Sequence, residues 1–196
     1  MSSQGVGKRV LRKEDDRYMR GKGQYVADIK LANMQDVAFV RSPVAHAKLL
    51  DIHIPEPLRE QVFTAADLRN AGVKPIVADT ALEGFRSSEQ PALAEGKVRY
   101  VGELVAMCVA PTSAGAEDIA AAVQLDYEEQ DVVHEMLQGR QADAPRVHDH
   151  WPDNLFLKTN ITVNFDGVKD APVKVSRKIR TSRQVMAPME GRGVLA

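Results

Sequence analysis

Residues 104–128, LVAMCVAPTSAGAEDIAAAVQLDYE, decide the fold of this chain. Residues 104–109 form a short apolar run, and a run of this length is typical of a buried strand. Residues 111–113 end that strand and cap a helix that is expected over 114–123. The apolar side chains of that helix fall on one face at helical spacing: Ala116, Ile119, Ala120 and Val123. Residues 124–128 follow as a second strand, so the stretch predicts a strand–helix–strand unit.

The sequence before this unit is dominated by predicted strands. Residues 36–41 are rich in β-branched and aromatic side chains, which indicates a buried strand. Apolar residues alternate through 49–54, which indicates a partner strand. Thr64 is a good N-cap for a short helix that Gly72 closes. Strands and helices together predict a mixed α+β fold that runs to about residue 150.

Three regions are expected along the chain. Residues 1–25 are predicted to form an extended packing arm, because the basic stretch 8–22 is interrupted by acidic residues and has few apolar anchors. Residues 26–150 are predicted to form the α+β domain, and residues 151–196 the start of a second, incomplete unit. That unit is expected to contain two alternating strands, at 161–165 and 173–180.

Composition narrows the class of protein. The 196 residues are 44% hydrophobic and 27% charged, with a formal net charge of −1, which is ordinary for a globular domain and gives no support for nucleic acid or an anionic membrane as a partner. The longest apolar run is far too short to span a bilayer, and the polar N-terminus lacks a signal-peptide core, so we expect a cytoplasmic protein. The single cysteine, Cys108, can neither form an internal disulfide nor hold an iron–sulfur cluster, which needs about four ligands.

Five stretches, in their order and spacing, resemble the xanthine dehydrogenase / aldehyde oxidase / carbon monoxide dehydrogenase family of molybdenum hydroxylases. They are RKED at 12–15 with GKGQYVAD at 21–28, FVRSPVAHA at 39–47, FTAADL at 63–68, VRYVGELVA at 98–106 with the helix and DYE at 126–128 that follow it, and RQVMAPMEGRGVLA at 183–196. The second is similar to the family's "VRSPHAHA" and the fifth to its "PMEPRG". Val44 replaces a histidine found in many relatives, and Gly191 replaces the usual proline.

The resemblance implies a specific fold and chemistry. The first four stretches imply an α/β hammerhead domain with a mixed sheet, and the fifth implies the first strands of a molybdopterin-binding domain. The family hydroxylates aldehydes or electron-poor carbons of N-heterocycles with oxygen from water. Its molybdenum cofactor is expected in the molybdopterin cytosine dinucleotide form, and electrons leave through iron–sulfur clusters and FAD on other chains. The expected partners are therefore the remainder of the large subunit, an iron–sulfur subunit and a flavin subunit.

The same resemblance limits what these residues do by themselves. The family's catalytic glutamate and most of its pterin-binding segments lie beyond residue 196, so no catalytic residue and no bound cofactor are expected here. Gln184 is the candidate cofactor contact: counted back from Glu190, it aligns with a glutamine that approaches molybdenum in some relatives, and an amide can donate to a metal oxo group without adding charge. The alternative is a polar residue at a strand end. Glu190 and Arg192 are expected to pair locally or to contact the missing domain.

Two further polar groups have structural interpretations. Arg41, Ser42 and His46 are expected to cluster at a strand end, without an acidic partner nearby in sequence. His148 and His150 suggest a His-x-His metal pair, but a metal site needs three or four ligands, so no metal is expected.

Three functions remain open on the sequence. The chain is a scaffold part of a molybdenum hydroxylase, or a non-catalytic assembly subunit of a split enzyme, or a stand-alone module that binds a small molecule. The first two predict exposed apolar surface near Val163, Phe165, Val173, Val175 and Met189, whereas the third predicts a closed monomer with a pocket. Because residue 196 lies within a family segment, a truncation, a gene fragment or a split gene would each explain this end.

Overall fold

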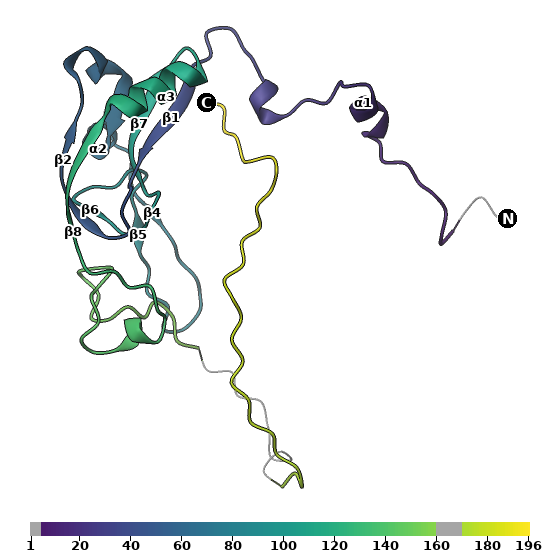
Figure 1. Cartoon of the computed structure of the whole chain (residues 1–196), viewed down its shortest axis with the longest axis vertical. Helices are drawn as coiled ribbons and strands as arrows, with labels where there is room; N and C mark the ends of the chain where they lie inside the picture. Colours follow the sequence, from purple (N-terminus) through teal and green to yellow (C-terminus); the bar gives the residue numbers. More distant parts are fainter. Residues whose placement is uncertain (1–4, 160–169) are drawn as a thin grey trace. The chain divides into compact units, whose positions relative to one another are not determined.

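Two three-stranded sheets and one well-formed helix build the larger unit of this chain. The computed structural model describes residues 5–159 and 170–196. It divides into a unit spanning Asn33–Lys169 and a second unit made of Met1–Ala32 with Asp170–Ala196, and each is described by itself (Figure 1).

The first sheet has the order β1–β7–β3, with β7 (Leu104–Ala110) in the centre. Strands β1 (Asp36–Arg41) and β3 (Val62–Thr64) both pair with β7 in the antiparallel direction. Helix α3 (Ser113–Ala122) packs on β1 and β7. It begins at Thr112, whose hydroxyl oxygen accepts a hydrogen bond from the Gly115 backbone N–H at 3.1 Å. The core between helix and sheet contains Ala38, Val40, Val62, Ala106, Cys108, Ala110, Ala116, Ile119 and Val123.

The second sheet has the order β6–β2–β8 and is also antiparallel. Its strands are β2 (Ala47–His53), β6 (Lys97–Val98) and β8 (Gln124–Glu129). A smaller core of Ala47, Ala94, Val98 and Val105 lies beside it. Because Val105 belongs to β7, this core joins the second sheet to the first.

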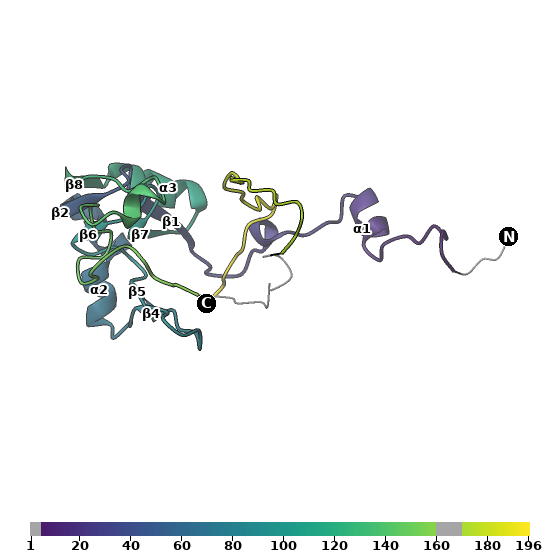
Figure 2. The ribbon, with the colours of Figure 1, turned by 90° about the horizontal axis from the view of Figure 1, so that it is seen from below.

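Short elements complete the larger unit. They are η2 (Glu56–Gln61), α2 (Ala65–Asn70), the strand pair β4 (Ile76–Val77) and β5 (Glu89–Gln90), and η3 (Gln138–Arg140). Helices α2 and α3 lie on opposite sides of the unit (Figure 2). The carboxylate of Asp67 accepts hydrogen bonds from the Thr64 backbone N–H and hydroxyl, both at 2.8 Å, which confirms the predicted start of α2. Gly72, at φ 80°, follows the helix as predicted.

The predicted α+β class is confirmed, with one difference in strand arrangement. The unit at 104–128 does form strand, helix and strand, but β7 and β8 belong to different sheets. Every pairing between described strands is antiparallel, whereas a mixed sheet was expected. The short helix α3 turns the chain from one sheet to the other, so it makes no parallel crossover within a single sheet.

The smaller unit contains little regular structure among its described residues. Helix α1 (Asp15–Met19) interrupts the arm at 1–25 that was expected to be extended, and η1 (Val26–Asp28) follows this arm. The predicted strand at 173–180 is wrong for this structure, in which these residues form no strand. Val173, Val175 and Ile179 are 77%, 79% and 84% exposed, and no strand among the described residues pairs with them to form a ladder of hydrogen bonds. The strand predicted at 161–165 lies outside the described residues.

Among the described residues, none of the helices has the length and hydrophobicity that crossing a bilayer requires.

Candidate functional site

The β1–β7–β3 sheet presents apolar side chains on both of its faces. Successive side chains of a strand lie on opposite faces of the sheet. The residues next in sequence to those that face α3 therefore lie on the face away from this helix. The register places Phe39, Met107 and Phe63 in one row across the three strands, and Val37 opposite Val109. We call these five side chains the outer face. Val37 and Phe39 are 46% and 37% exposed, and the other three are half-buried. Strands that are apolar on both sides are usually covered on both sides.

The predicted polar cluster at the end of β1 is a structural clamp. The Ser42 backbone N–H donates to the Glu103 carbonyl at 2.9 Å, and the Gly102 N–H donates to the Ser42 carbonyl at 2.8 Å. A guanidinium N–H of Arg41 donates to the Gly102 carbonyl at 3.0 Å. These bonds hold the turn before β7 against the end of β1. As expected, Arg41 and Ser42 have a structural role.

His46 takes part in a different contact. Its Nδ1 lies 2.6 Å from the carbonyl oxygen of Asp131, and the Gln130 N–H donates to the His46 carbonyl at 2.9 Å. The Nε2 atom is buried without a hydrogen-bond partner in the described part of the chain. Because a carbonyl oxygen only accepts hydrogen bonds, Nδ1 is the donor in this contact. His46 therefore fastens the segment after β8 to the start of β2 and forms no dyad with Ser42.

A buried ion pair that the sequence did not reveal lies before β7. The carboxylate of Glu103 accepts hydrogen bonds from the backbone N–H of Arg99 and from its guanidinium, the latter at 3.1 Å. Glu103 is only 7% exposed, so its charge needs this partner. The turn between Arg99 and Glu103 contains Gly102 at φ 85°. A glycine between an arginine and a glutamate four residues apart is the sequence pattern that could have indicated this ion pair.

His148 and His150 pack together on a tryptophan. Their ring centroids are 5.9 Å apart, and the His148 ring lies 4.5 Å from the ring of the buried Trp151. Burial lowers the pKa of His148, and the positive charges of Arg99, His150 and Lys97 lower it further against the opposing effect of Asp149. Within residues 5–159 and 170–196, no three His, Cys, Asp or Glu side chains are grouped as metal ligands. The pair is therefore an aromatic packing unit in this structure.

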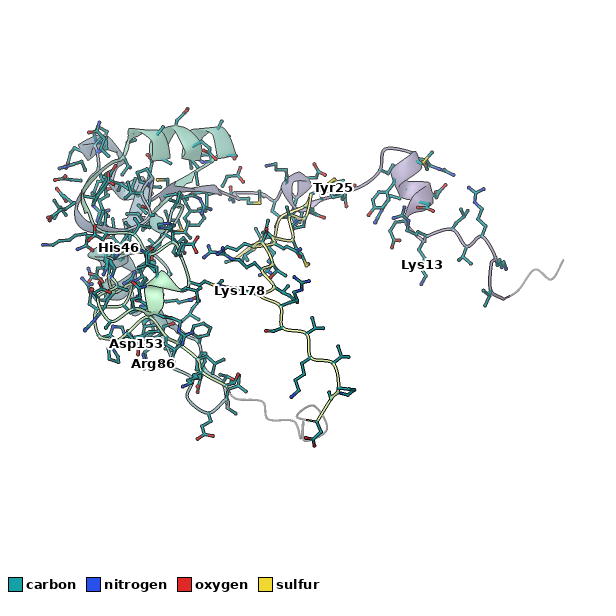
Figure 3. All side chains as sticks on the ribbon, turned by 60° about the horizontal axis from the view of Figure 1, so that its bottom comes forward. Lys13, Tyr25, His46, Arg86, Asp153 and Lys178 are labelled. Atoms are coloured by element: carbon teal, nitrogen blue, oxygen red, sulfur yellow. The ribbon has the colours of Figure 1, made fainter. Side chains whose placement is uncertain are left out.

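Ion pairs fix the turn that carries these histidines. The Lys97 ammonium donates to the Asp149 carboxylate at 2.7 Å and to the Arg146 carbonyl at 3.3 Å. The hydrogen bond from Lys97 is the main cause of a lowered pKa at Asp149, and burial opposes it. The Arg86 guanidinium, 5.9 Å from the Trp151 ring, binds the carboxylate of Asp153, and the two labelled side chains lie together (Figure 3).

A cleft of about 390 Å³ opens beside this turn. We call it the α2 cleft, because α2 forms one wall and the turn at 148–150 another. Its polar lining consists of Arg69, Lys74, Glu89, Glu95, Arg99 and the two histidines. Its apolar lining includes Leu68, Val73, Pro75, Pro91 and Leu93. Sequence reasoning missed this cleft, since its walls come from separate segments of the chain.

The C-terminal candidates lie in the smaller unit. Gln184 is exposed in an irregular stretch. Glu190 was expected to pair with Arg192 or to contact a missing domain, but its carboxylate accepts a hydrogen bond from the Val26 N–H at 2.9 Å. An added Cβ at Gly193 would lie 1.9 Å from a Val26 methyl carbon, whereas nothing lies within 4 Å of one at Gly191.

Comparison with known proteins identifies the class of domain and then the family. The sequence model described as "Aldehyde oxidase and xanthine dehydrogenase, a/b hammerhead domain" matches residues 20–131. The quinoline 2-oxidoreductase of Pseudomonas putida 86 superposes with a TM-score of 0.62 and 41% identity over 66% of this chain and 17% of that chain. These matches define an α/β hammerhead domain, as the resemblance predicted. The chain belongs to the aldehyde oxidase and xanthine dehydrogenase family of molybdenum hydroxylases.

Curated relatives extend the match beyond the domain. The nicotine 6-hydroxylase large subunit of Paenarthrobacter nicotinovorans is 35% identical over 97% of this chain and 24% of its own length. The carbon monoxide dehydrogenase large chain of Hydrogenophaga pseudoflava is 33% identical over 72% of this chain and 17% of its own length. The chain thus spans about a quarter or less of these relatives.

The described residues do not form a cradle for a molybdenum cofactor. A cofactor contact needs a side chain whose position is fixed by its neighbours, and Gln184 is exposed in a stretch without regular structure. Cys108 is completely buried, and burial raises the pKa of its thiol, so it is not presented as a metal ligand.

Proposed function

We propose that this chain is the N-terminal part of the large subunit of a molybdenum-dependent hydroxylase or dehydrogenase, with a scaffold role and no activity alone. The outer face of the β1–β7–β3 sheet carries this proposal. Phe39 and the half-buried Met107 and Phe63 leave part of their apolar surface in water, which is unfavourable, because fully burying such a side chain contributes roughly 1.5–3 kcal/mol. The relatives are several times longer, and we assign the covering surface to the remainder of the large subunit.

The substrate in this proposal is an aldehyde or an N-heterocycle. Two relatives are named for nicotine and quinoline, which are both nitrogen heterocycles, and this favours the second class. The molybdenum cofactor, in the cytosine dinucleotide form, would be held by the remainder of the subunit. Because the single cysteine is buried, the iron–sulfur clusters belong to another chain, as does the FAD. The assembled enzyme is proposed to be cytoplasmic.

Co-expression tests the proposal. The chain is produced together with the polypeptide encoded immediately downstream, purified through a tag on this chain, and assayed for molybdenum by mass spectrometry. We expect the second polypeptide to co-purify with stoichiometric molybdenum. Phe39→Asp should abolish co-purification, because it places a charge in the apolar contact. Leu50→Asp is the matched control, since Leu50 is 50% exposed on the other sheet.

The outcomes separate the three functions. A stable complex without molybdenum would favour a non-catalytic assembly subunit of a split enzyme. A monomer that never binds the second polypeptide would overturn the scaffold role and favour the stand-alone binding module. The α2 cleft is the observation that keeps this last function open.

We propose Gln184 as a contact with the cofactor whose position the remainder of the large subunit would fix. In the molybdenum-containing complex, we expect Gln184→Ala to change the absorption spectrum of the molybdenum centre while the complex stays intact. Ser182→Ala, two residues earlier, is the control. An unchanged spectrum for both variants would make Gln184 an ordinary surface residue.

A further inference from the structure

We propose that the α2 cleft binds a small organic carboxylate, whose anionic group contacts Arg99 and His148 and whose apolar part lies against Leu68, Pro91 and Leu93. The cleft lies wholly within the unit Asn33–Lys169, and its use does not depend on the proposed function of the chain.

The size and lining of the cleft suit an organic ligand. Its volume of about 390 Å³ lies in the range of about 300–1,000 Å³ that small-molecule sites occupy. Leu93 is 3% exposed and forms an apolar wall of the cleft, and the rigid ring of Pro91 also lines it. Apolar walls with a few converging polar groups are the usual composition of such sites. The cleft therefore offers contacts to a hydrocarbon body as well as to a charged head.

Arg99 supplies the main group for the carboxylate. One guanidinium nitrogen, Nη1, donates to the Lys97 carbonyl at 3.2 Å and to the Glu103 carboxylate at 3.1 Å. Within the described residues, the other two guanidinium nitrogens have no hydrogen-bond partner. Because the Glu103 contact fixes the side chain, the remaining donors are held in place for a ligand. A planar fork of this kind matches the two oxygens of a carboxylate.

His148 is placed beside this fork and is held there. Its ring packs on Trp151 at 4.5 Å, and Trp151 is 7% exposed. The Arg86 guanidinium lies 5.9 Å from the same tryptophan ring, and the Lys97–Asp149 ion pair fixes the turn. Burial is the main cause of the lowered pKa of His148, and the positive charges of Arg99, His150 and Lys97 lower it further. A ligand carboxylate in the cleft would balance part of this positive charge. A site whose groups are fixed before binding loses little entropy when the ligand arrives.

The carboxylates of the cleft restrict the ligand to a single negative charge. Glu95 is paired with Arg69, and Glu89, on β5 opposite Val77, also lines the cleft. Inorganic phosphate carries between one and two negative charges at neutral pH and would be repelled by both glutamates. A monocarboxylate with an apolar body keeps the contact to Arg99 and meets less repulsion. The cleft therefore favours a monocarboxylate over inorganic phosphate.

Calorimetric titration of the full chain tests the proposal with three probes: benzoate, its neutral isostere benzamide, and inorganic phosphate. We expect saturable benzoate binding about tenfold or more tighter than benzamide, since a charge-assisted hydrogen bond contributes about that factor. Phosphate should bind more weakly than benzoate. Equal binding of benzoate and benzamide would overturn the assignment of the charged contact, and no binding of benzoate would overturn the site itself.

Variants connect the binding to the cleft. His148→Asn should weaken benzoate several-fold and leave benzamide unchanged, and His53→Asn is the control on an exposed histidine of β2. Arg99→Met alone risks unfolding the chain, because it leaves the buried Glu103 carboxylate without its partner. It is therefore combined with Glu103→Gln, and thermal denaturation tests whether the double variant folds. In the folded double variant, benzoate should lose its advantage over benzamide. Full benzoate affinity in either variant would contradict the proposal.

Discussion

At the scale of single residues, Asp67 is the side chain on which the start of α2 depends. Its carboxylate binds the Thr64 N–H and hydroxyl and, at 2.7 Å, the guanidinium of Arg59. We expect Asp67→Ala to lower the free energy of unfolding by about 0.5–2 kcal/mol, the usual effect of losing a helix cap. Urea denaturation followed by circular dichroism measures the loss. Asp118→Ala, on the exposed side of α3, should change stability by less than about 0.5 kcal/mol.

His148 makes a second residue-scale prediction, on pH. Its pKa is lower in the folded chain than in the unfolded chain, mainly because it is partly buried and then because of Arg99, His150 and Lys97. Above the unfolded pKa both states hold a neutral ring, so there is no effect. As the pH falls below about 6.5, the unfolded state takes up the proton more readily, and stability decreases. Melting temperatures from pH 8 to pH 5 should therefore fall less in His148→Asn than in the parent chain. An identical fall in both would contradict the cause given for the shift.

At the scale of elements, α3 stabilises the first sheet through one large side chain. Ile119 is 7% exposed and packs in the core with Ala106, Cys108 and Val123. We expect Ile119→Ala to cost about 2–5 kcal/mol, because it leaves a cavity between helix and sheet. Thermal and urea denaturation report the loss. Leu50→Ala, at an exposed position of β2, should be close to neutral.

The elements also show what the sequence could predict. Strand β1 was predictable from its β-branched and aromatic residues and the proline that follows it, and helix α3 from the apolar residues on its buried side and its capping residues. The alternation at 173–180 misled, since Val173, Val175 and Ile179 form a strand only where another strand is at hand to pair with them.

The arrangement of elements was less accessible. Nothing in residues 104–128 indicates that β7 and β8 belong to different sheets, because short-range spacing carries no information on long-range pairing. The same holds for the α2 cleft. Arg69, Arg99 and His148 come together only after folding, and the sequence had suggested the histidines as a metal pair.

At the scale of the whole molecule, the outer face decides how the chain behaves alone. Exposed apolar surface was expected near five residues; it is confirmed at Val173, Val175 and Met189, while Val163 and Phe165 lie outside the described residues. The sheet adds the outer face, with Phe39 at its edge strand. A surface of this kind binds amphipathic dyes and promotes self-association.

The last prediction follows from that surface. The isolated chain should enhance the fluorescence of anilinonaphthalene sulfonate, and Phe39→Ser should reduce this enhancement, because the phenyl ring is 37% exposed and its loss removes much of the apolar row. Val175→Ser, in the smaller unit, separates the contribution of the outer face from that of the C-terminal segment. In complex with the remainder of a large subunit, the parent chain should lose the part of the signal that Phe39→Ser removes. If that part persisted in a stable complex, the outer face would not be the surface that the large subunit covers, and the scaffold role would need a different contact.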